Sequence, residues 1–87
     1  MLALALVAGL AGCGGRASTP AERVAACLND RGFLVQAAGG EVDGTSPGGV
    51  AFAVALATGA VDDTANPGRR RLGAADRAAV RDCLGRR

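Results

Sequence analysis

Four stretches of the chain carry ordered patterns of hydrophobic residues. Residues 2–12 form an uncharged run of Leu, Ala, Val and Gly. Residues 20–31 and 74–84 place apolar side chains three and four positions apart, which is the spacing of an amphipathic helix. Residues 50–57 alternate bulky side chains with alanine, which is the two-residue period of a β-strand. These patterns predict two helices and a strand that follow an apolar opening segment.

The first predicted helix has local signals at both ends. Thr19 suits the N-cap, Pro20 suits the first helical position, and Glu22 completes a capping box. Gly32 can adopt the left-handed conformation that ends a helix, and Phe33 can then pack back on its last turn. These residues set the expected bounds of the helix.

The segment between the two helices predicts strands joined by glycine-rich loops. Residues 33–37 predict a first strand, and the stretch "AAGGEVDGTSPGG" that follows is rich in turn formers and is expected to be a loop. Residues 50–57 predict a second strand, with a helix as the alternative because of their alanine content, and residues 59–61 can form a short third strand. We therefore expect a small two-layer α+β domain in the order helix-strand-strand-helix.

Composition narrows the possible functions. The 87 residues suffice for one small domain, which buries too little surface to be stabilised by its core alone. Two Phe, no Tyr, no Trp and a net charge of +2 do not indicate a nucleic-acid partner. The chain has no His, which excludes Ser-His-Asp and Cys-His catalytic sites and His-containing zinc sites. We expect no nucleic-acid partner, no cofactor, no metal and no catalytic residues.

The apolar opening segment, residues 2–12, is too short to span a bilayer, because a helix of this length rises about 16 Å against a hydrocarbon core of about 30 Å. Its length is typical of a secretory signal. The segment leads into Leu10-Ala11-Gly12-Cys13, which resembles the lipobox of bacterial lipoproteins. The resemblance implies cleavage before Cys13 and a thioether-linked diacylglycerol on Cys13, and a chain that carries two or more acyl groups stays on its membrane.

One feature of the opening segment departs from this class. A secretory signal normally begins with Lys or Arg, whereas no basic side chain precedes Arg16, so either the true start lies upstream or export is inefficient. The alternative interpretation is that residues 2–11 form a buried helix of a soluble protein and that Cys13 is an ordinary small apolar residue. Under the lipoprotein interpretation the chain divides into a signal peptide (1–12), an acylated Cys with a flexible tether (13–18) and a disulfide-stapled domain (19–87).

Three cysteines in an exported protein normally leave one thiol unpaired. If Cys13 is acylated, Cys27 and Cys83 are the only pair left, and an oxidising compartment would join them. Both lie near the C-terminal ends of their predicted helices, so a bond between them favours helices that run roughly parallel or cross steeply. The alternative is a thiol-redox or metal-handling function for this pair, although it lacks the Cys-x-x-Cys spacing at a helix start that activates a thiol.

A basic cluster, Arg69-Arg70-Arg71, precedes the second predicted helix. If the helices run parallel, these side chains lie at the tethered end of the domain, where they could contact anions or lipid headgroups. The alternative is a solvated loop.

Two acidic pairs, Asp62-Asp63 and Glu41-x-Asp43, could coordinate a hard cation. Neither has the repeated oxygen spacing and closing Glu of a calcium loop, so solvated turns are favoured.

Together these patterns predict a small lipoprotein on the extracytoplasmic face of a bacterial cell membrane. Its expected partners are the membrane, through the lipid anchor, and an envelope protein that the sequence does not name. Its expected role is that of a non-catalytic binding or accessory module of the cell envelope. The alternative function is thiol-redox or metal handling through Cys27 and Cys83.

Overall fold

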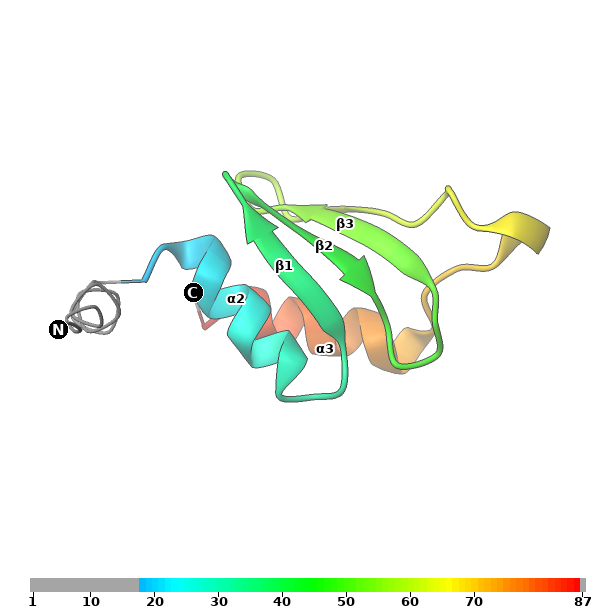
Figure 1. The fold of residues 1–87 in the computed structure, drawn as a ribbon, viewed down its shortest axis with the longest axis horizontal. Coiled ribbons are helices and arrows are strands. Elements are labelled where there is room, and N and C mark those ends of the chain that lie inside the picture. Colours follow the sequence, from blue (N-terminus) through cyan, green and yellow to red (C-terminus); the bar gives the residue numbers. More distant parts are fainter. Residues whose placement is uncertain (1–17, 87) are drawn as a thin grey trace, which may run out of the picture.

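The computed structural model describes residues 18–86. The elements, shown in Figure 1, are α2 (Pro20–Asn29), β1 (Leu34–Ala38), β2 (Glu41–Thr45), β3 (Ala51–Ala55), β4 (Ala60–Asp62), the 3-10 helix η1 (Pro67–Arg69) and α3 (Ala74–Leu84). A disulfide between Cys27 and Cys83 joins the two α-helices. The expected class, a small α+β domain with one inter-helix disulfide, is confirmed.

The four strands form one antiparallel meander in the order β1-β2-β3-β4. Both α-helices lie on the same side of this sheet (Figure 1). Between the two layers lies a single core, and its most fully buried side chains are Val24, Leu28, Phe33, Val42, Val54, Val80 and Cys83. The rings of Phe33 and Phe52 meet edge to face in this core, with their centroids 5.8 Å apart.

The local signals predicted at both ends of α2 are present. The Thr19 hydroxyl accepts a hydrogen bond from the Glu22 N–H (3.1 Å), and the Glu22 carboxylate accepts one from the Thr19 N–H (2.9 Å). Gly32 has φ +91°, and the Phe33 N–H donates back to a carbonyl of the last turn (3.2 Å). The helix ends at Asn29, two residues before the expected bound, because the turn that closes it occupies the residues that follow.

The expected loop between the first two predicted strands is wrong in part, because it contains β2. Glu41–Thr45 pairs with β1 on one side and β3 on the other, and Gly39-Gly40 form the tight turn before it. Glycine and aspartate lower the strand propensity of this segment, but two neighbouring strands supply all the partners that it needs. The strands predicted at 33–37 and 50–57 are confirmed as β1 and β3, and the short third strand as β4.

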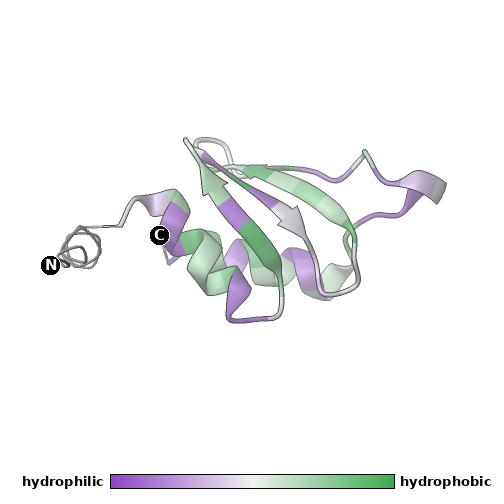
Figure 2. Cartoon of the chain, viewed as in Figure 1, coloured by the Kyte–Doolittle hydropathy of each residue, from purple (hydrophilic) through white to green (hydrophobic). Residues whose placement is uncertain are grey.

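Two polar side chains fix the long connection from β4 to α3. The Asn66 carboxamide donates to the Ala51 carbonyl (2.8 Å) and accepts from the Ala51 N–H (2.8 Å), which continues the sheet where β4 ends. The buried Asp63 carboxylate accepts from the Leu72 N–H (2.9 Å) and from the Arg77 guanidinium (2.7 Å). Figure 2 shows that this connection is mainly hydrophilic, so specific hydrogen bonds position it against the domain.

The helices do not run parallel, which corrects one of the two expected arrangements. In Figure 1 the chain follows α2 in one direction and α3 in roughly the opposite direction, and the two helices cross obliquely. Cys27 and Cys83 lie where the helices approach, with their Cα atoms 5.7 Å apart. An oblique crossing removes the axial offset that an end-to-end antiparallel alignment would impose, so the bond does not require parallel helices.

A charged contact reinforces the junction of the helices beside the disulfide. The Arg31 guanidinium, which follows α2, donates a hydrogen bond to the Asp82 carboxylate of α3. Arg86 also approaches the same carboxylate oxygen, at 3.2 Å. The hydrogen bond from Arg31 is the largest cause that holds the pKa of Asp82 below its ordinary value, and the nearby Arg86 charge acts in the same direction.

This lowered pKa predicts a loss of stability in acid. A carboxyl group whose pKa is lower in the folded state stabilises the fold above its ordinary pKa, and this contribution is lost as the pH falls through the lowered value. We therefore expect the urea midpoint of the full chain to fall as the pH is reduced below about 5. Asp82→Asn should show a smaller fall, whereas Asp30→Asn, at a residue that forms no salt bridge within residues 18–86, should retain the wild-type dependence. Equal slopes for the wild type and Asp82→Asn would contradict the assignment.

Candidate binding face of the sheet

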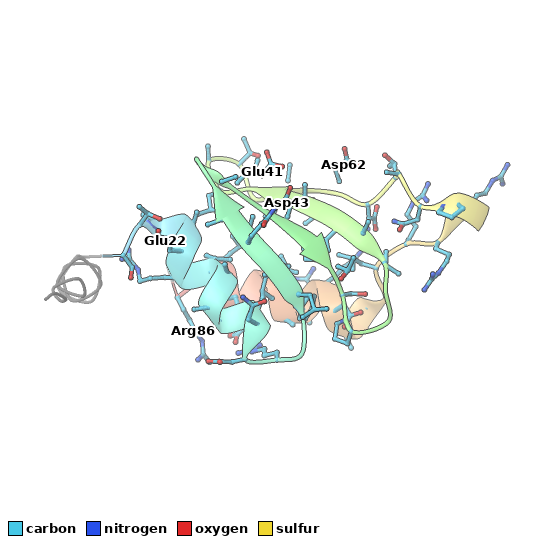
Figure 3. All side chains as sticks on the ribbon, viewed as in Figure 1. Glu22, Glu41, Asp43, Asp62 and Arg86 are labelled. Atoms are coloured by element: carbon cyan, nitrogen blue, oxygen red, sulfur yellow. A yellow bond between two sulfur atoms is a disulfide. The ribbon has the colours of Figure 1, made fainter. Side chains whose placement is uncertain are left out.

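One surface of the sheet points away from the helices, and we call it the open face. Alternate strand residues form it: Leu34, Gln36, Ala38, Glu41, Asp43, Thr45, Ala51, Ala53, Ala55, Ala60 and Asp62. Figure 3 shows Glu41, Asp43 and Asp62 on this side of the molecule, whereas Arg86 lies on the helix side. The open face therefore combines short alanine side chains with carboxylates.

The alanines leave a depression in the open face. A groove of about 780 Å³ passes over Ala51 and Ala53, between Leu34 and Asp62. A smaller hollow of about 240 Å³ borders this groove at Ala53 and Asp62. Leu34 is 76% exposed, and among the described residues it is the large hydrophobic side chain that lies on the surface. The groove thus has a methyl-lined floor and an apolar residue at one end.

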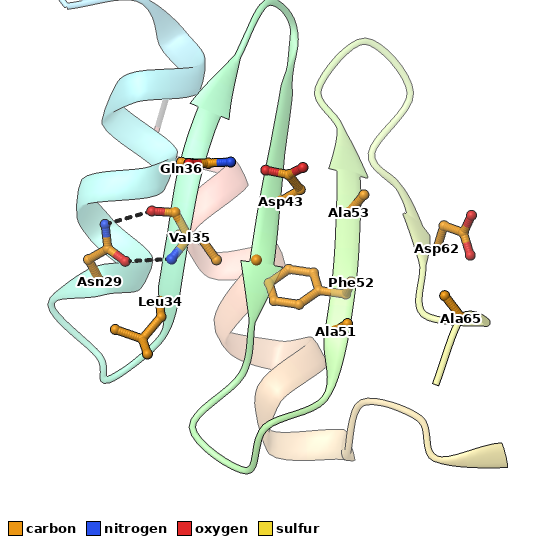
Figure 4. Close-up of a pocket in the computed structure, with 11 residues that line it drawn as sticks. Asn29, Leu34, Val35, Gln36, Asp43, Ala51, Phe52, Ala53, Asp62 and Ala65 are labelled. Carbon is orange, nitrogen blue, oxygen red and sulfur yellow. Dashed lines mark hydrogen bonds between the residues drawn. The ribbon is translucent and has the colours of Figure 1, made fainter. Parts of the chain in front are cut away.

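A row of paired residues crosses the groove. Gln36, Asp43, Ala53 and Asp62 are neighbours in register on the four successive strands, and Figure 4 shows them side by side across the sheet. Neighbouring strands lie about 4.8 Å apart, so Asp43 and Asp62 are separated by about 10 Å with Ala53 between them. Glu41 lies two residues from Asp43 on β2, at a spacing of about 7 Å. The three carboxylates are therefore separated but lie on one surface.

These carboxylates are the only charged groups in the four strands. The Oδ1 atom of Asp43 is buried and has no hydrogen-bond partner within the described part of the chain. The hydroxyl of Thr64 donates to Asp62 (2.7 Å), as does its N–H (3.1 Å), and these bonds hold the pKa of Asp62 below its ordinary value. The open face is therefore negatively charged at neutral pH.

The outer edge of β1 is partly closed by Asn29. Its carboxamide donates to the Val35 carbonyl (3.1 Å) and accepts from the Val35 N–H (2.9 Å), as the dashed lines in Figure 4 show. One side chain thereby takes the place of a neighbouring strand at this residue, which blocks strand addition there. The open face is thus more accessible to a partner than this edge.

The spacing of the carboxylates determines what the open face can bind. Oxygen ligands of one calcium ion lie within about 2.6 Å of it, so a shared ion would require these side chains to converge. No group of three or more His, Cys, Asp or Glu side chains within residues 18–86 could hold a metal ion. Separate carboxylates on a grooved surface are suited to binding several separate positive charges.

The two acidic pairs, Asp62-Asp63 and Glu41-x-Asp43, do not lie in the solvated turns that were expected for them. Asp62 lies on the open face, whereas Asp63 is buried and bonded to Arg77, so the two side chains do not form a joint site. Glu41 and Asp43 lie on β2 and share the open face. The interpretation of these residues as turns is wrong because the pairing of β2 and the burial of Asp63 depend on distant parts of the chain.

The basic cluster lies far from the start of the domain. Figure 1 shows η1 and the residues after it at the opposite end of the domain from residue 18. Arg70 donates to the Gly48 carbonyl (2.7 Å), and Arg71 approaches the Asp63 carboxylate at 3.7 Å. The condition of parallel helices is not met, so the argument that placed Arg69 and its neighbours beside lipid headgroups no longer applies. Anion binding by Arg69, Arg70 and Arg71 stays a prediction.

The surroundings of the disulfide are those of a structural cross-link. Cys83 is fully buried and Cys27 is partly buried against the same core. Both sulfur atoms belong to the later turns of their helices, away from the helix N-termini that stabilise a reactive thiolate. This position favours a bond that holds the two helices together.

Cys13 and the lipobox lie outside the described residues. None of the helices within residues 18–86 combines the length and the apolar character needed to cross a membrane.

Sequence reasoning considered the three carboxylates but did not predict the open face. The missing signal was the alternation Glu41-Val42-Asp43, which has the two-residue period of a strand within a segment dominated by turn formers. Without β2, the facing positions of β1 and β3 could not be aligned. The sequence therefore did not indicate that the acidic residues share one surface.

Comparison with known proteins found no relative of this chain. No protein-family model matches the chain, and neither the curated proteins nor the solved structures include a match.

Proposed function

We propose that this chain is a lipid-anchored, extracytoplasmic protein whose domain acts as a non-catalytic binding or accessory module of the bacterial cell envelope. The observation that carries the proposal is the combination of Leu10-Ala11-Gly12-Cys13 with a Cys27–Cys83 disulfide. Disulfides persist in oxidising compartments outside the cytoplasm, which is where a lipobox protein is delivered. Acylation of the first cysteine also accounts for the odd number of cysteines.

The domain supports a binding role by its surface. Its two helices and four strands bury most of their large apolar side chains in one shared core, and the open face remains as a grooved, charged surface. The chain contains no histidine, so the Ser-His-Asp and Cys-His groups of common hydrolases are absent from it. Binding is the activity that this arrangement supports best.

Intact-mass measurement of the full chain, isolated from bacterial membranes, tests the anchor. The expected mass corresponds to loss of residues 1–12, addition of a diacylglyceryl group at Cys13, and two hydrogens fewer than the dithiol form. Cys13→Ser should carry no lipid and should retain residues 1–12. A wild-type mass equal to that of the unmodified 87 residues would contradict the proposal.

A further inference from the structure

We infer that the open face is the docking surface of the module and that its occupant is an extended polypeptide segment of a partner that carries two or three Lys or Arg side chains. This deepens the proposed function and rests on it only for the location of the partner. The inference stands on the shape of the groove, the spacing of its carboxylates and the absence of basic residues from the strands.

The charge of the surface selects a cationic partner. The strands that carry Glu41, Asp43 and Asp62 contain no basic residue. The described arginines lie on the helices and the connections, and of these Arg71 adds its charge to the hydrogen bonds that lower the pKa of Asp62. The buried Oδ1 of Asp43 has no hydrogen-bond donor within residues 18–86. A Lys or Arg side chain in the groove would supply the opposite charge beside this carboxylate.

The spacing of the carboxylates selects an extended peptide. Side chains on one side of an extended chain recur about every 7 Å, which is the spacing of Glu41 and Asp43 along β2. Asp62 lies about 10 Å from Asp43 across the sheet, within reach of a third long basic side chain. No group of three or more His, Cys, Asp or Glu side chains in the described part of the chain could hold a metal ion, so separate charges along an extended chain match the surface better.

The groove floor suits the stems of such side chains. Lys and Arg carry aliphatic stems that lie along apolar surfaces while the charged group stays polar. Ala51 and Ala53 form a methyl floor of this kind beside Asp43 and Asp62, and Leu34 supplies an apolar contact at the end of the groove. The same surface thus has a place for both parts of a basic side chain.

A second copy of this chain is disfavoured as the occupant. A symmetric contact between two open faces would bring like-charged carboxylates together across the interface, which is destabilising. The charge pattern therefore favours a different, basic chain.

The test uses the full chain in detergent and a fluorescent peptide of alternating Arg and Ala, followed by fluorescence anisotropy. We expect this peptide to bind and a peptide of alternating Glu and Ala not to bind. The double variant Asp43→Asn, Asp62→Asn should weaken binding about tenfold. The matched variant Asp30→Asn, Asp76→Asn removes the same charge from other surfaces and should change the affinity by less than about twofold.

Ala53→Leu separates the groove from simple charge attraction. This substitution keeps all three carboxylates and fills the floor between Asp43 and Asp62, so it should weaken binding several-fold. Equal weakening by both charge variants, or unchanged binding of Ala53→Leu, would overturn the inference. Self-association through the open face, detected by light scattering and lost when Ala53 is enlarged, would also overturn it. These outcomes do not depend on the mass of Cys13, so failure of docking and failure of the lipid anchor are distinguishable.

Discussion

Removal of the Cys27–Cys83 bond is expected to lower the free energy of unfolding by about 4 kcal/mol. The cross-link closes a loop with a sequence separation of 56, and such a loop strongly restricts the unfolded chain. A domain of this size has a total stability on the order of 5 kcal/mol, so most of it depends on this one bond. We expect the Cys27→Ala, Cys83→Ala variant to be only marginally stable, with a substantial unfolded fraction at 37 °C.

The measurement is urea unfolding of the full chain in detergent, followed by far-ultraviolet circular dichroism because the chain has no Trp or Tyr. Loss of a cross-link expands the unfolded state, so the dependence of the free energy on urea should become steeper. Val80→Ala is the matched control, because it removes buried atoms from the same helix and keeps the bond. It should reduce stability without steepening the dependence. A loss below about 1 kcal/mol for the double variant would contradict the prediction.

The same bond separates the proposed function from the redox alternative. A structural disulfide should resist mild reductant in the folded protein, because Cys83 is buried and the bond holds the helices together. Free-thiol counting before and after mild reduction measures this. Rapid, reversible reduction without unfolding would favour a thiol-redox function for Cys27 and Cys83.

The helices could be predicted from the sequence because their determinants are local. Thr19 and Glu22 lie three residues apart, and the turn after Asn29 depends on the next few residues. The second helix, Ala74–Leu84, has the bounds that its apolar spacing predicts. The pairing of Cys27 with Cys83 was also accessible, because it follows from counting cysteines once one of them is assigned to lipid.

The sheet was only partly predictable because its determinants are distant in sequence. β2 has weak strand propensity and is stabilised by neighbours on both sides, which no local pattern reveals. Asn29 and Asn66 replace missing strand partners through side-chain bonds to Val35 and Ala51, and such contacts have no sequence signature. The open face depends on β2, and because β2 was not predicted, the open face was not predicted either.

The centre of the sheet predicts the second large effect, at Gly44. This residue has φ +152° and faces Val35 of β1 and Phe52 of β3. A Cβ atom there would lie 2.0 Å from the Leu34 carbonyl oxygen and 2.7 Å from the Val35 Cα, and both are backbone atoms that cannot rotate away. We therefore expect Gly44→Ala to lower the free energy of unfolding by about 3 kcal/mol, as overpacking and backbone strain do elsewhere.

Gly48→Ala is the matched control, because a Cβ there would meet only the Ser46 hydroxyl at 3.9 Å. It should change stability by less than about 0.5 kcal/mol in the same urea measurement. Hydrogen exchange should show that Gly44→Ala weakens protection in β1 and β2 before it affects α2, because the clash separates these two strands.

Wild-type stability of Gly44→Ala would mean that Val35 does not face Gly44. A shift of the register by one residue would turn the side chains of β2 over, so Glu41 and Asp43 would face the helices and the open face would lose two of its three carboxylates. The stability of this variant therefore tests the docking surface as well as the fold.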